Sequence, residues 1–265
     1  MTPGPARTTI GVIGGSGVAG VLDERDRTLH RVATPWGAPS GPVEEGHVGG
    51  VRVLFLARHG PGHTIPPHRV NYRANIDALR ALGAEAIVTV SSVGSLREEL
   101  APGTFVLPSQ FVDLTKQRPT TFFDGGKVYH VSLADPFCPD LLRSAADAGR
   151  AVGTPFAEGK TYVCVEGPRF STRAESSFFR GFADVIGMTL VPEVTLARER
   201  AVCYACLAMV TDYDVWSERP VDAAEIVETM ARNSDRMARL LQRLLPALAH
   251  APTCSCAGAL DHAGV

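Results

Sequence analysis

The sequence has no apolar run close to the roughly 18 residues that a membrane-spanning helix needs, so we expect no contact with the membrane interior. It also has no apolar signal-peptide region before its first core segment, which predicts a cytoplasmic protein. The formal charge of −2 gives no overall attraction to nucleic acid, so any anion-binding site has to be local. With 45% hydrophobic and 20% charged residues, the chain has the composition of a globular protein with a sizeable core.

Zinc-finger spacing is also missing, although the chain has six cysteines. Without a secretion signal these thiols are expected to be reduced, and Cys203 and Cys206 lie in an apolar stretch typical of a protein core. Cys254 and Cys256 are not followed by a second ligand pair, so we expect no structural metal. The sequence leaves open whether Cys254 and Cys256 pair with each other.

Buried strands alternate with helical stretches along the chain, which predicts an α/β fold with a mixed, mainly parallel central sheet flanked by helices. We expect a disordered N-terminus over 1–8, one domain over 9–250 and an extended tail over 251–265. The expected strands are Thr9–Ile13, Val51–Ala57, Ala86–Ser91, Thr161–Val165, Asp184–Ile186 and Cys203–Val210. The expected helices are Val70–Leu82, Pro139–Val152, Ser171–Phe182 and Asp222–Ala249.

A glycine-rich loop follows the first expected strand, at Ile13-Gly14-Gly15-Ser16-Gly17. Its backbone amides and the Ser16 hydroxyl suit phosphate, although glycines are equally common in plain tight turns. Gly15, Gly17 and Gly20 also match the dinucleotide-binding pattern G-x-G-x-x-G. That pattern needs an acidic residue about 20 residues on, and none occurs between Arg27 and Val43, which disfavours a nucleotide cofactor.

Two further loops after expected strands carry anion-binding side chains. Arg58 and His59 follow one strand, and a guanidinium offers phosphate a fork of donors. Ser91 and Ser92 lie at the end of the next expected strand, and Ser95 and Glu98 just after it also fit a helix capping box. Because ligands bind at the carboxyl ends of parallel strands, the three loops together predict one anion pocket. A metal site at the three histidines of this region is not expected, since the glycines and proline between them oppose a helix: His59, His63 and His68.

Three later strands end in residues suited to a flat heterocycle. Phe170 is able to stack on a base, although a phenylalanine is more often a core residue. Asp212 and Asp214 follow the longest apolar strand in alternate positions, so their side chains are expected on one side. Burial raises the pKa of a carboxyl, and such a group is able to pass a proton to a leaving group. An exposed Asx turn is the alternative.

Long strings within the chain resemble the methylthioadenosine phosphorylase family. The most specific are Glu-Gly-Pro-Arg-Phe-Ser-Thr-Arg-Ala-Glu-Ser, from Glu166, and Met-Val-Thr-Asp-Tyr-Asp, from Met209. The resemblance runs in order over about residues 9 to 245, through the segments Ile10–Gly17, Ala57–Asn75, Gly94–Leu100, Arg118–Gly125, Glu166–Ser176, Asp184–Glu193 and Met209–Trp216. It implies a nucleoside phosphorylase-like fold, a homotrimer with active sites near the interfaces, and no cofactor, with inorganic phosphate as co-substrate.

The resemblance also implies roles for individual residues. Asp212, protonated, donates to N7 of the purine, and Asp214, ionised, accepts from the 6-amino group. His130 belongs to a segment that reaches a neighbouring subunit's pocket, and His63 lies near the 5' substituent. The implied phosphate contacts are Ser16, Arg58, His59, Ser91, Ser92 and Thr189, and the other substrate contacts are Met188 for the ribose and Phe170 and Ser171 for the base.

One departure from the family pattern concerns the 5' pocket. The stretch Ser217–Pro220 is about two residues short, and Ala223 falls where the family has a valine. A smaller side chain leaves room, so adenosine and other 5'-modified adenosines are expected as additional substrates. The alternatives are a broad purine nucleoside phosphorylase acting on inosine and guanosine, a hydrolase that uses water, and a nucleotide-binding protein without enzymatic activity.

Overall fold

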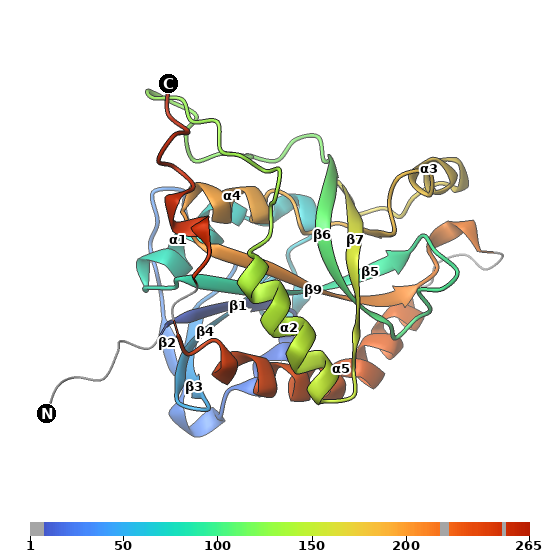
Figure 1. The fold of residues 1–265 in the computed structure, drawn as a ribbon, viewed down its shortest axis with the longest axis horizontal. Coiled ribbons are helices and arrows are strands. Elements are labelled where there is room, and N and C mark those ends of the chain that lie inside the picture. Colours follow the sequence, from blue (N-terminus) through green and yellow to red (C-terminus); the bar gives the residue numbers. More distant parts are fainter. Residues whose placement is uncertain (1–7, 218–222, 251–252) are drawn as a thin grey trace, which may run out of the picture.

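A computed structural model describes residues 8–217, 223–250 and 253–265 of the chain, and its centre is a nine-stranded mixed sheet (Figure 1). The strand order is β2-β3-β4-β1-β5-β8-β7-β6-β9, and β9 pairs with β5 as well, so the last five strands close into a barrel. The strands are β1 (Ile10–Gly14), β2 (Thr28–His30), β3 (Val43–Val48), β4 (Val51–Ala57), β5 (Ala86–Ser95), β6 (Phe105–Leu114), β7 (Phe156–Val165), β8 (Val185–Gly187) and β9 (Cys203–Asp212).

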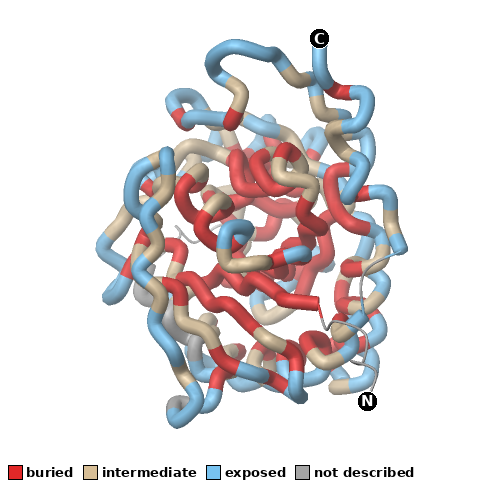
Figure 2. The backbone as a smooth tube through the Cα atoms, turned by 90° about the vertical axis from the view of Figure 1, so that its left-hand side faces the viewer, coloured by how far each residue is buried: buried red, intermediate tan, exposed pale blue. Residues whose placement is uncertain are grey.

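Helices cover both faces of the sheet, as the continuous apolar strands require. Leu240 of α5 and Leu141 of α2 pack on one face, and Ile76 of α1 and Leu196 of α4 pack on the other. Figure 2 shows that the buried backbone is concentrated in the central strands. The helices are α1 (Tyr72–Ala81), α2 (Pro139–Ala151), α3 (Arg173–Phe179), α4 (Glu193–Glu199) and α5 (Ala223–Ala247).

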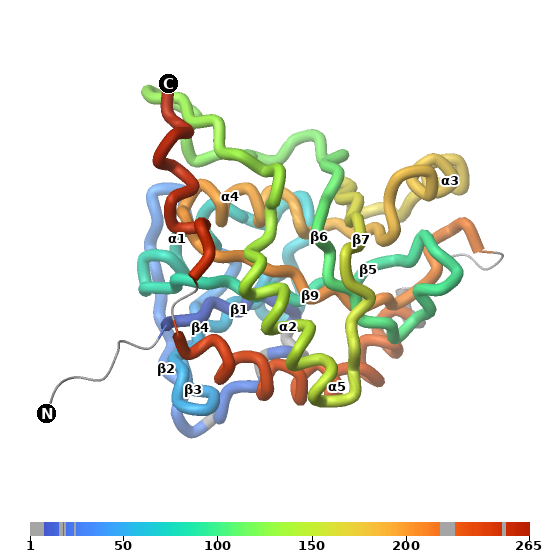
Figure 3. Tube along the Cα trace, in the orientation of Figure 1, coloured from blue at the N-terminus to red at the C-terminus, as the bar shows by residue number. Residues whose placement is uncertain are grey.

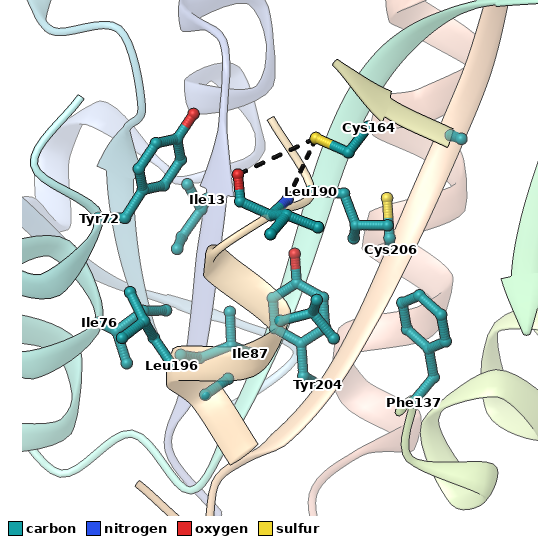
Figure 4. Close-up of a cluster of buried hydrophobic side chains, with 14 of the residues drawn as sticks. Ile13, Tyr72, Ile76, Ile87, Phe137, Cys164, Leu190, Leu196, Tyr204 and Cys206 are labelled. Atoms are coloured by element: carbon teal, nitrogen blue, oxygen red, sulfur yellow. Dashed lines mark hydrogen bonds between the residues drawn. The ribbon is translucent and has the colours of Figure 1, made fainter. Parts of the chain in front are cut away.

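Figure 4 shows the core beneath α1 and α4, where Ile13, Ile87 and Tyr204 project from three neighbouring strands. Strands β1, β4, β5 and β9 run parallel to one another in the sheet. Their carboxyl ends therefore lie at one edge. Two of the loops that were expected to bind an anion follow β1 and β4, whereas Ser91 and Ser92 lie within β5, which continues to Ser95. The fold positions these loops by burying the strands that precede them.

The α/β fold and its mainly parallel central sheet are confirmed, and all six expected strands are present with ends that differ by a few residues. The structure adds elements that the apolar pattern did not reveal. Strand β6 contains Pro108 and Gln110, and β3 has two glutamates and a histidine, so neither is a continuous apolar run. Helix α4 has only seven residues.

The helix capping box that Ser95 and Glu98 also fit does not form, because strand β5 continues through Ser95. Gly94 and Ser95 pair with β8, and the Ser95 hydroxyl donates to the carbonyl of Arg97 at 2.6 Å instead of opening a helix. A capping box does occur at the start of α3, where Thr172 and Glu175 bond each other's backbone N–H.

The chain after residue 252 is not extended, contrary to expectation. Residues Ser255–Gly258 form a 3₁₀ turn, and Gly264 pairs with Tyr129 as an antiparallel bridge. The tail and the segment around Tyr129 run side by side (Figure 3). Backbone hydrogen bonds hold the tail to this segment, with the N–H of His130 donating to Ala263 and the N–H of Val265 donating to Val128. Of the N-terminus expected to be disordered, residues 1–7 lie outside the described part, and Thr8 is buried.

Candidate active site

Arg58, directly after β4, is held by a carboxylate that the sequence did not single out. Its Nε and Nη2 donate to the two oxygens of Glu193 at 2.9 and 3.0 Å, and Nη1 donates to the carbonyl of Val90 at 3.0 Å. Both side chains are buried. Burial acts to lower the pKa of Arg58, but the charge and hydrogen bonds of Glu193 outweigh it and hold the pKa above its usual value. These bonds use three of five guanidinium N–H groups, which leaves two for an anion.

His59 is fixed as a neutral ring beside Arg58. Its Nδ1 lies 2.8 Å from the carbonyl of Ile65 and therefore carries the proton, which leaves Nε2 free to accept. The ring stacks on His63 with 4.2 Å between centroids. Burial is the main cause that lowers the pKa of His59 to about 4, with a contribution from the charge of Arg58. The ring is therefore uncharged at neutral pH.

Two hydroxyls expected to bind phosphate meet, although they come from different strands. The Oγ of Ser91 on β5 lies 3.1 Å from Oγ1 of Thr189, which follows β8. Both residues are buried, and the Oη of Tyr162 lies 3.3 Å from the Ser91 hydroxyl. The structure therefore gathers three hydroxyl groups beside Val90, whose carbonyl binds Arg58. Such a cluster suits an oxyanion that accepts several hydrogen bonds.

The two aspartates after β9 lie in different environments. Asp212 is half-buried, and its oxygens accept from the Thr211 hydroxyl and from the backbone N–H of Asp214, both at 2.8 Å. Asp214 is buried and its Oδ2 has no hydrogen-bond partner among the described residues. Burial raises the pKa of Asp214, although the nearby Ser176 hydroxyl acts to lower it. Asp214 therefore holds a proton more readily than an exposed aspartate does.

The buried Ser176 hydroxyl of α3 lies close enough to this carboxyl to lower its pKa, but it makes no hydrogen bond of good geometry among the described residues. Two orphaned polar groups in one place cost free energy unless a ligand satisfies them. Gly94 of β5 leaves room for the aspartate pair, since a Cβ at this position would lie 3.0 Å from Oδ1 of Asp212 and 3.3 Å from Cβ of Asp214. These contacts place the end of β5 beside the two aspartates.

The segment Glu166–Phe170, after β7, is anchored at its start and exposed at its end. Arg118 donates to a Glu166 carboxylate oxygen at 2.9 Å and to the Glu166 carbonyl at 2.6 Å. A Cβ at Gly167 would lie 2.5 Å from the Met188 sulfur, so Met188 packs against this turn. Phe170 is 40% exposed, which places it outside the core and leaves its ring free to contact a ligand.

Of the remaining residues expected in the site, His63 contacts these clusters through its stacking on His59, and no described side-chain interaction joins Ser92, Ser171 or His130 to them. Ser92 and Ser171 are half-buried, and His63 and His130 are exposed. The side chains of Ser16 and Ala223 lie outside the described part of the chain. His130 belongs instead to the segment that pairs with the tail, where its backbone N–H donates to Ala263 at 2.7 Å.

Sequence reasoning missed four residues that build the site: Tyr162, Glu193, Arg118 and Ser176. Glu193 had a signal, because it is an acidic residue next to the apolar stretch Leu190–Val191 and an acid there needs a partner. The other three are common residue types within ordinary strand, loop or helix sequence. Only the fold reveals that they face a ligand-binding residue.

One group of described residues has the composition of a metal site, and it lies apart from these clusters: Cys138, Cys203, Cys254 and Cys256. A hollow lined by Thr8, Ile10 and Leu248, among others, shares no residue with the candidate site. It lies at the amino ends of β1 and β5 and therefore on the opposite edge of the sheet.

Comparison with known proteins agrees with this arrangement. Residues 9–246 match the model of the Phosphorylase superfamily. The S-methyl-5'-thioadenosine phosphorylase of Pyrococcus horikoshii is 53% identical over 251 residues, which cover 95% of this chain and 97% of that protein. The enzyme of the same name from Nitrosopumilus maritimus is 48% identical, over 96% of this chain and 97% of its own.

Solved structures show the same fold. A methylthioadenosine phosphorylase from an Antarctic soil metagenomic library superimposes with a TM-score of 0.92 at 42% identity, covering 98% of this chain and 93% of that one. A methylthioadenosine phosphorylase from Schistosoma mansoni, in complex with adenine, gives a TM-score of 0.87 at 36% identity, covering 91% and 92%.

The fold and these relatives thus define a nucleoside phosphorylase. Within the Phosphorylase superfamily, the chain belongs to the S-methyl-5'-thioadenosine phosphorylases. Among the described residues, no helix combines the length and apolar character needed to cross a membrane.

Proposed function

We propose that the protein cleaves S-methyl-5'-thioadenosine with inorganic phosphate, releasing adenine and a 5-methylthioribose 1-phosphate. A phosphate oxygen forms a bond to C1' as the bond from C1' to N9 breaks. The electron pair of that bond moves into the purine, and a proton delivered to N7 neutralises it. Negative charge develops on the base and positive charge on the sugar. Catalysis therefore requires a proton donor beside the base and an anion beside the sugar.

The phosphate end consists of Arg58, the hydroxyls of Ser91 and Thr189, and the neutral ring of His59. The two free N–H groups of Arg58 donate to phosphate oxygens, and the buried position of the guanidinium strengthens this attraction. His59 Nε2 accepts a hydrogen bond from the hydroxyl of the phosphate monohydrogen ion. Ser16 and Ser92 complete this end as further hydroxyl donors.

The purine end needs one protonated and one ionised carboxyl, because N7 accepts a hydrogen bond and the 6-amino group donates one. The resemblance to the family gives the proton to Asp212, whereas burial favours a proton on Asp214 before substrate binds. We propose that the pair shares one proton, that Asp212 delivers it to N7, and that Asp214 accepts from the 6-amino group. Phe170 and Ser171 contact the base, and Met188 contacts the ribose.

One observation carries the proposal. An orphaned buried carboxyl and an orphaned buried hydroxyl, on Asp214 and Ser176, lie beside the strand that presents the phosphate hydroxyls. A purine with hydrogen-bonding groups on its edge would satisfy Asp214 and Ser176, while its sugar extends toward the hydroxyls of Ser91 and Thr189.

The decisive assay measures cleavage of methylthioadenosine, adenosine and inosine with and without phosphate. We expect methylthioadenosine and adenosine to react only with phosphate, and inosine to react slowly. Fast inosine cleavage would favour a broad purine nucleoside phosphorylase, and cleavage in phosphate-free buffer would favour a hydrolase. Thermal stabilisation by a dinucleotide but not by phosphate would favour a nucleotide-binding protein.

We further propose that the active form is a homotrimer in the cytoplasm, with His130 completing a neighbour's 5' pocket beside His63 and Ala223. The side chain of His130 is exposed, which is consistent with a contact to another subunit. Sedimentation is expected to show a trimer, and His130→Ala is expected to raise KM for 5'-substituted adenosines with phosphate KM nearly unchanged. A fully active monomer would disprove this.

A further inference from the structure

Four thiols from three distant parts of the chain meet beside the C-terminal tail. Cys138 begins α2, Cys203 begins β9, and Cys254 and Cys256 lie in the tail. Their four sulfur atoms all lie within 4.8 Å of one another, and three of the four residues are buried. Spacing along the sequence groups Cys203 with Cys206 and Cys254 with Cys256. The fold instead assembles a different set of four cysteines.

The spacing of these sulfurs fits a tetrahedral metal ion. The Sγ of Cys254 lies 3.5 Å from that of Cys138 and 3.3 Å from that of Cys203. Zinc–sulfur bonds of about 2.3 Å in a tetrahedron place sulfurs about 3.8 Å apart. These two distances are slightly shorter than that value, and the other sulfur pairs lie within 4.8 Å, so only small shifts are needed to enclose one ion. A closed set of four thiolates is characteristic of a structural site, which leaves no position for substrate or water.

The surroundings of the cluster favour negative charge. Nη1 of Arg198 lies 3.4 Å from the Cys256 sulfur, and the rest of this guanidinium donates to the carbonyls of Ser132 and Asp135. Cys138 occupies the N-cap of α2, a helix of 13 residues, where the helix dipole stabilises a thiolate. A cation and a helix terminus therefore compensate part of the double negative charge of a tetrathiolate zinc site.

We propose that Cys138, Cys203, Cys254 and Cys256 bind one zinc ion, which fastens the C-terminal tail to the sheet and to α2. Binding replaces four S–H protons by four Zn–S bonds, with no oxidation or reduction, and releases up to four protons. The ion joins the tail to the core about ten residues before the tail pairs with Tyr129. It thereby also steadies the segment that carries His130, although it takes no part in the chemistry at C1'.

The first experiment uses the full-length protein, purified under a reductant that keeps thiols free. Metal analysis is expected to find close to one zinc per chain, and replacement by cobalt is expected to give the absorption bands of tetrahedral thiolate coordination. Protein without stoichiometric zinc that also fails to take up added zinc would overturn the proposal. So would iron in place of zinc, or disulfides linking these four cysteines in protein purified without reductant.

Matched variants locate the ion. Cys254→Ser and Cys256→Ser are expected to lose zinc, whereas Cys206→Ser, at a buried cysteine outside the cluster, is expected to retain it. Amide hydrogen exchange at residues 263–265 is expected to quicken in the two tail variants but not in the control. Zinc retained by both tail variants would overturn the proposal, and the cobalt spectrum of the unaltered protein decides the matter if a variant fails to fold.

Discussion

The two ends of the candidate site differ in how far the protein satisfies its own polar groups. At the phosphate end, Arg58 is bonded on two sides of its guanidinium, and the Ser91 and Thr189 hydroxyls contact each other. At the purine end, Asp214 and Ser176 are buried without complete hydrogen bonding. A preorganised end requires little rearrangement when charge develops, whereas an unsatisfied end gains most when the base arrives.

The largest effect is expected where the preorganised end is broken. Glu193→Gln removes the charge that faces Arg58, so a buried cation loses its partner and the free energy of unfolding falls by about 3–5 kcal/mol. We also expect a higher phosphate KM, because the guanidinium is no longer held in place. Denaturant unfolding and initial-rate kinetics measure the two effects.

Glu199→Gln is the matched control, since Glu199 is also a buried acid of α4 but bonds Thr121 and the backbone of Phe122. It is expected to lower stability and leave phosphate KM unchanged. If Glu193→Gln also leaves phosphate KM unchanged, the ion pair is structural only and the phosphate end is not organised through it.

The purine end is tested by a pair of substitutions, Asp212→Asn and Asp214→Asn. Each is expected to lower kcat by about 10²-fold or more, because an asparagine amide is unable to transfer a proton to N7 and accepts from the 6-amino group more weakly than an ionised carboxylate does. The variant that lowers kcat more than KM, and that flattens the pH profile of kcat, identifies the carboxyl that delivers the proton. Near-normal kcat in Asp212→Asn would show that Asp212 is not the acid.

Stability is expected to separate the same two variants. Burial raises the folded-state pKa of Asp214, so its stability contribution is present at low pH and is lost as pH rises through that pKa. Asp214→Asn is therefore expected to raise Tm at neutral pH relative to the unaltered protein. Asp212→Asn is expected to lower it, because its oxygens accept bonds from Thr211 and the Asp214 backbone. Equal Tm changes would contradict the difference between the two environments.

A smaller effect concerns His59, whose pKa burial lowers from 6.5 to about 4. In this range the unfolded chain binds a proton that the folded protein excludes, so stability falls as pH drops from about 6.5 toward 4. His59→Gln is expected to reduce that loss, as thermal melts across this range would show. An NMR titration is expected to find no inflection of His59 near neutral pH, and one near pH 6.5 would refute the role of burial.

The smallest effect is expected at a single hydroxyl. Ser91→Ala removes one hydrogen bond to phosphate, worth about 0.5–1.5 kcal/mol, and is expected to raise phosphate KM about 2- to 10-fold. Thr89→Val is its control, since this hydroxyl on the same strand contacts Tyr204 rather than the site. An equal change in both variants would show a general effect of strand β5 and not a phosphate contact.

The sequence was sufficient to predict the strands whose apolar residues are continuous, because a sheet covered on both faces leaves that pattern. It could not predict β6, where Pro108 and Gln110 interrupt the pattern, or the second pairing of β9 that closes the barrel. Hydrogen bonds between strands that are distant in the sequence leave no periodic pattern of apolar residues.

The site divides in the same way. Residues at strand ends, such as Arg58 and Asp212, were identifiable because the carboxyl edge of a parallel sheet is a general place for ligands. Ser176 was not, and Glu193 was marked only by its place beside an apolar stretch, since each acts through a partner more than 30 residues away. The four cysteines beside the tail show the same limit, as spacing alone argued against a metal site that three-dimensional proximity now supports.

Closure of the barrel through β9 also limits where another chain is able to pair with the sheet. Because β9 is bonded to both β5 and β6, the only free edge of the sheet among the described strands is β2. That edge has three residues, and it ends at His30, whose ring lies 2.8 Å from a Glu45 carboxylate oxygen. Such a short, polar edge gives another chain little backbone to pair with, so the fold resists strand-by-strand aggregation. Contacts between copies must then form through helices and loops.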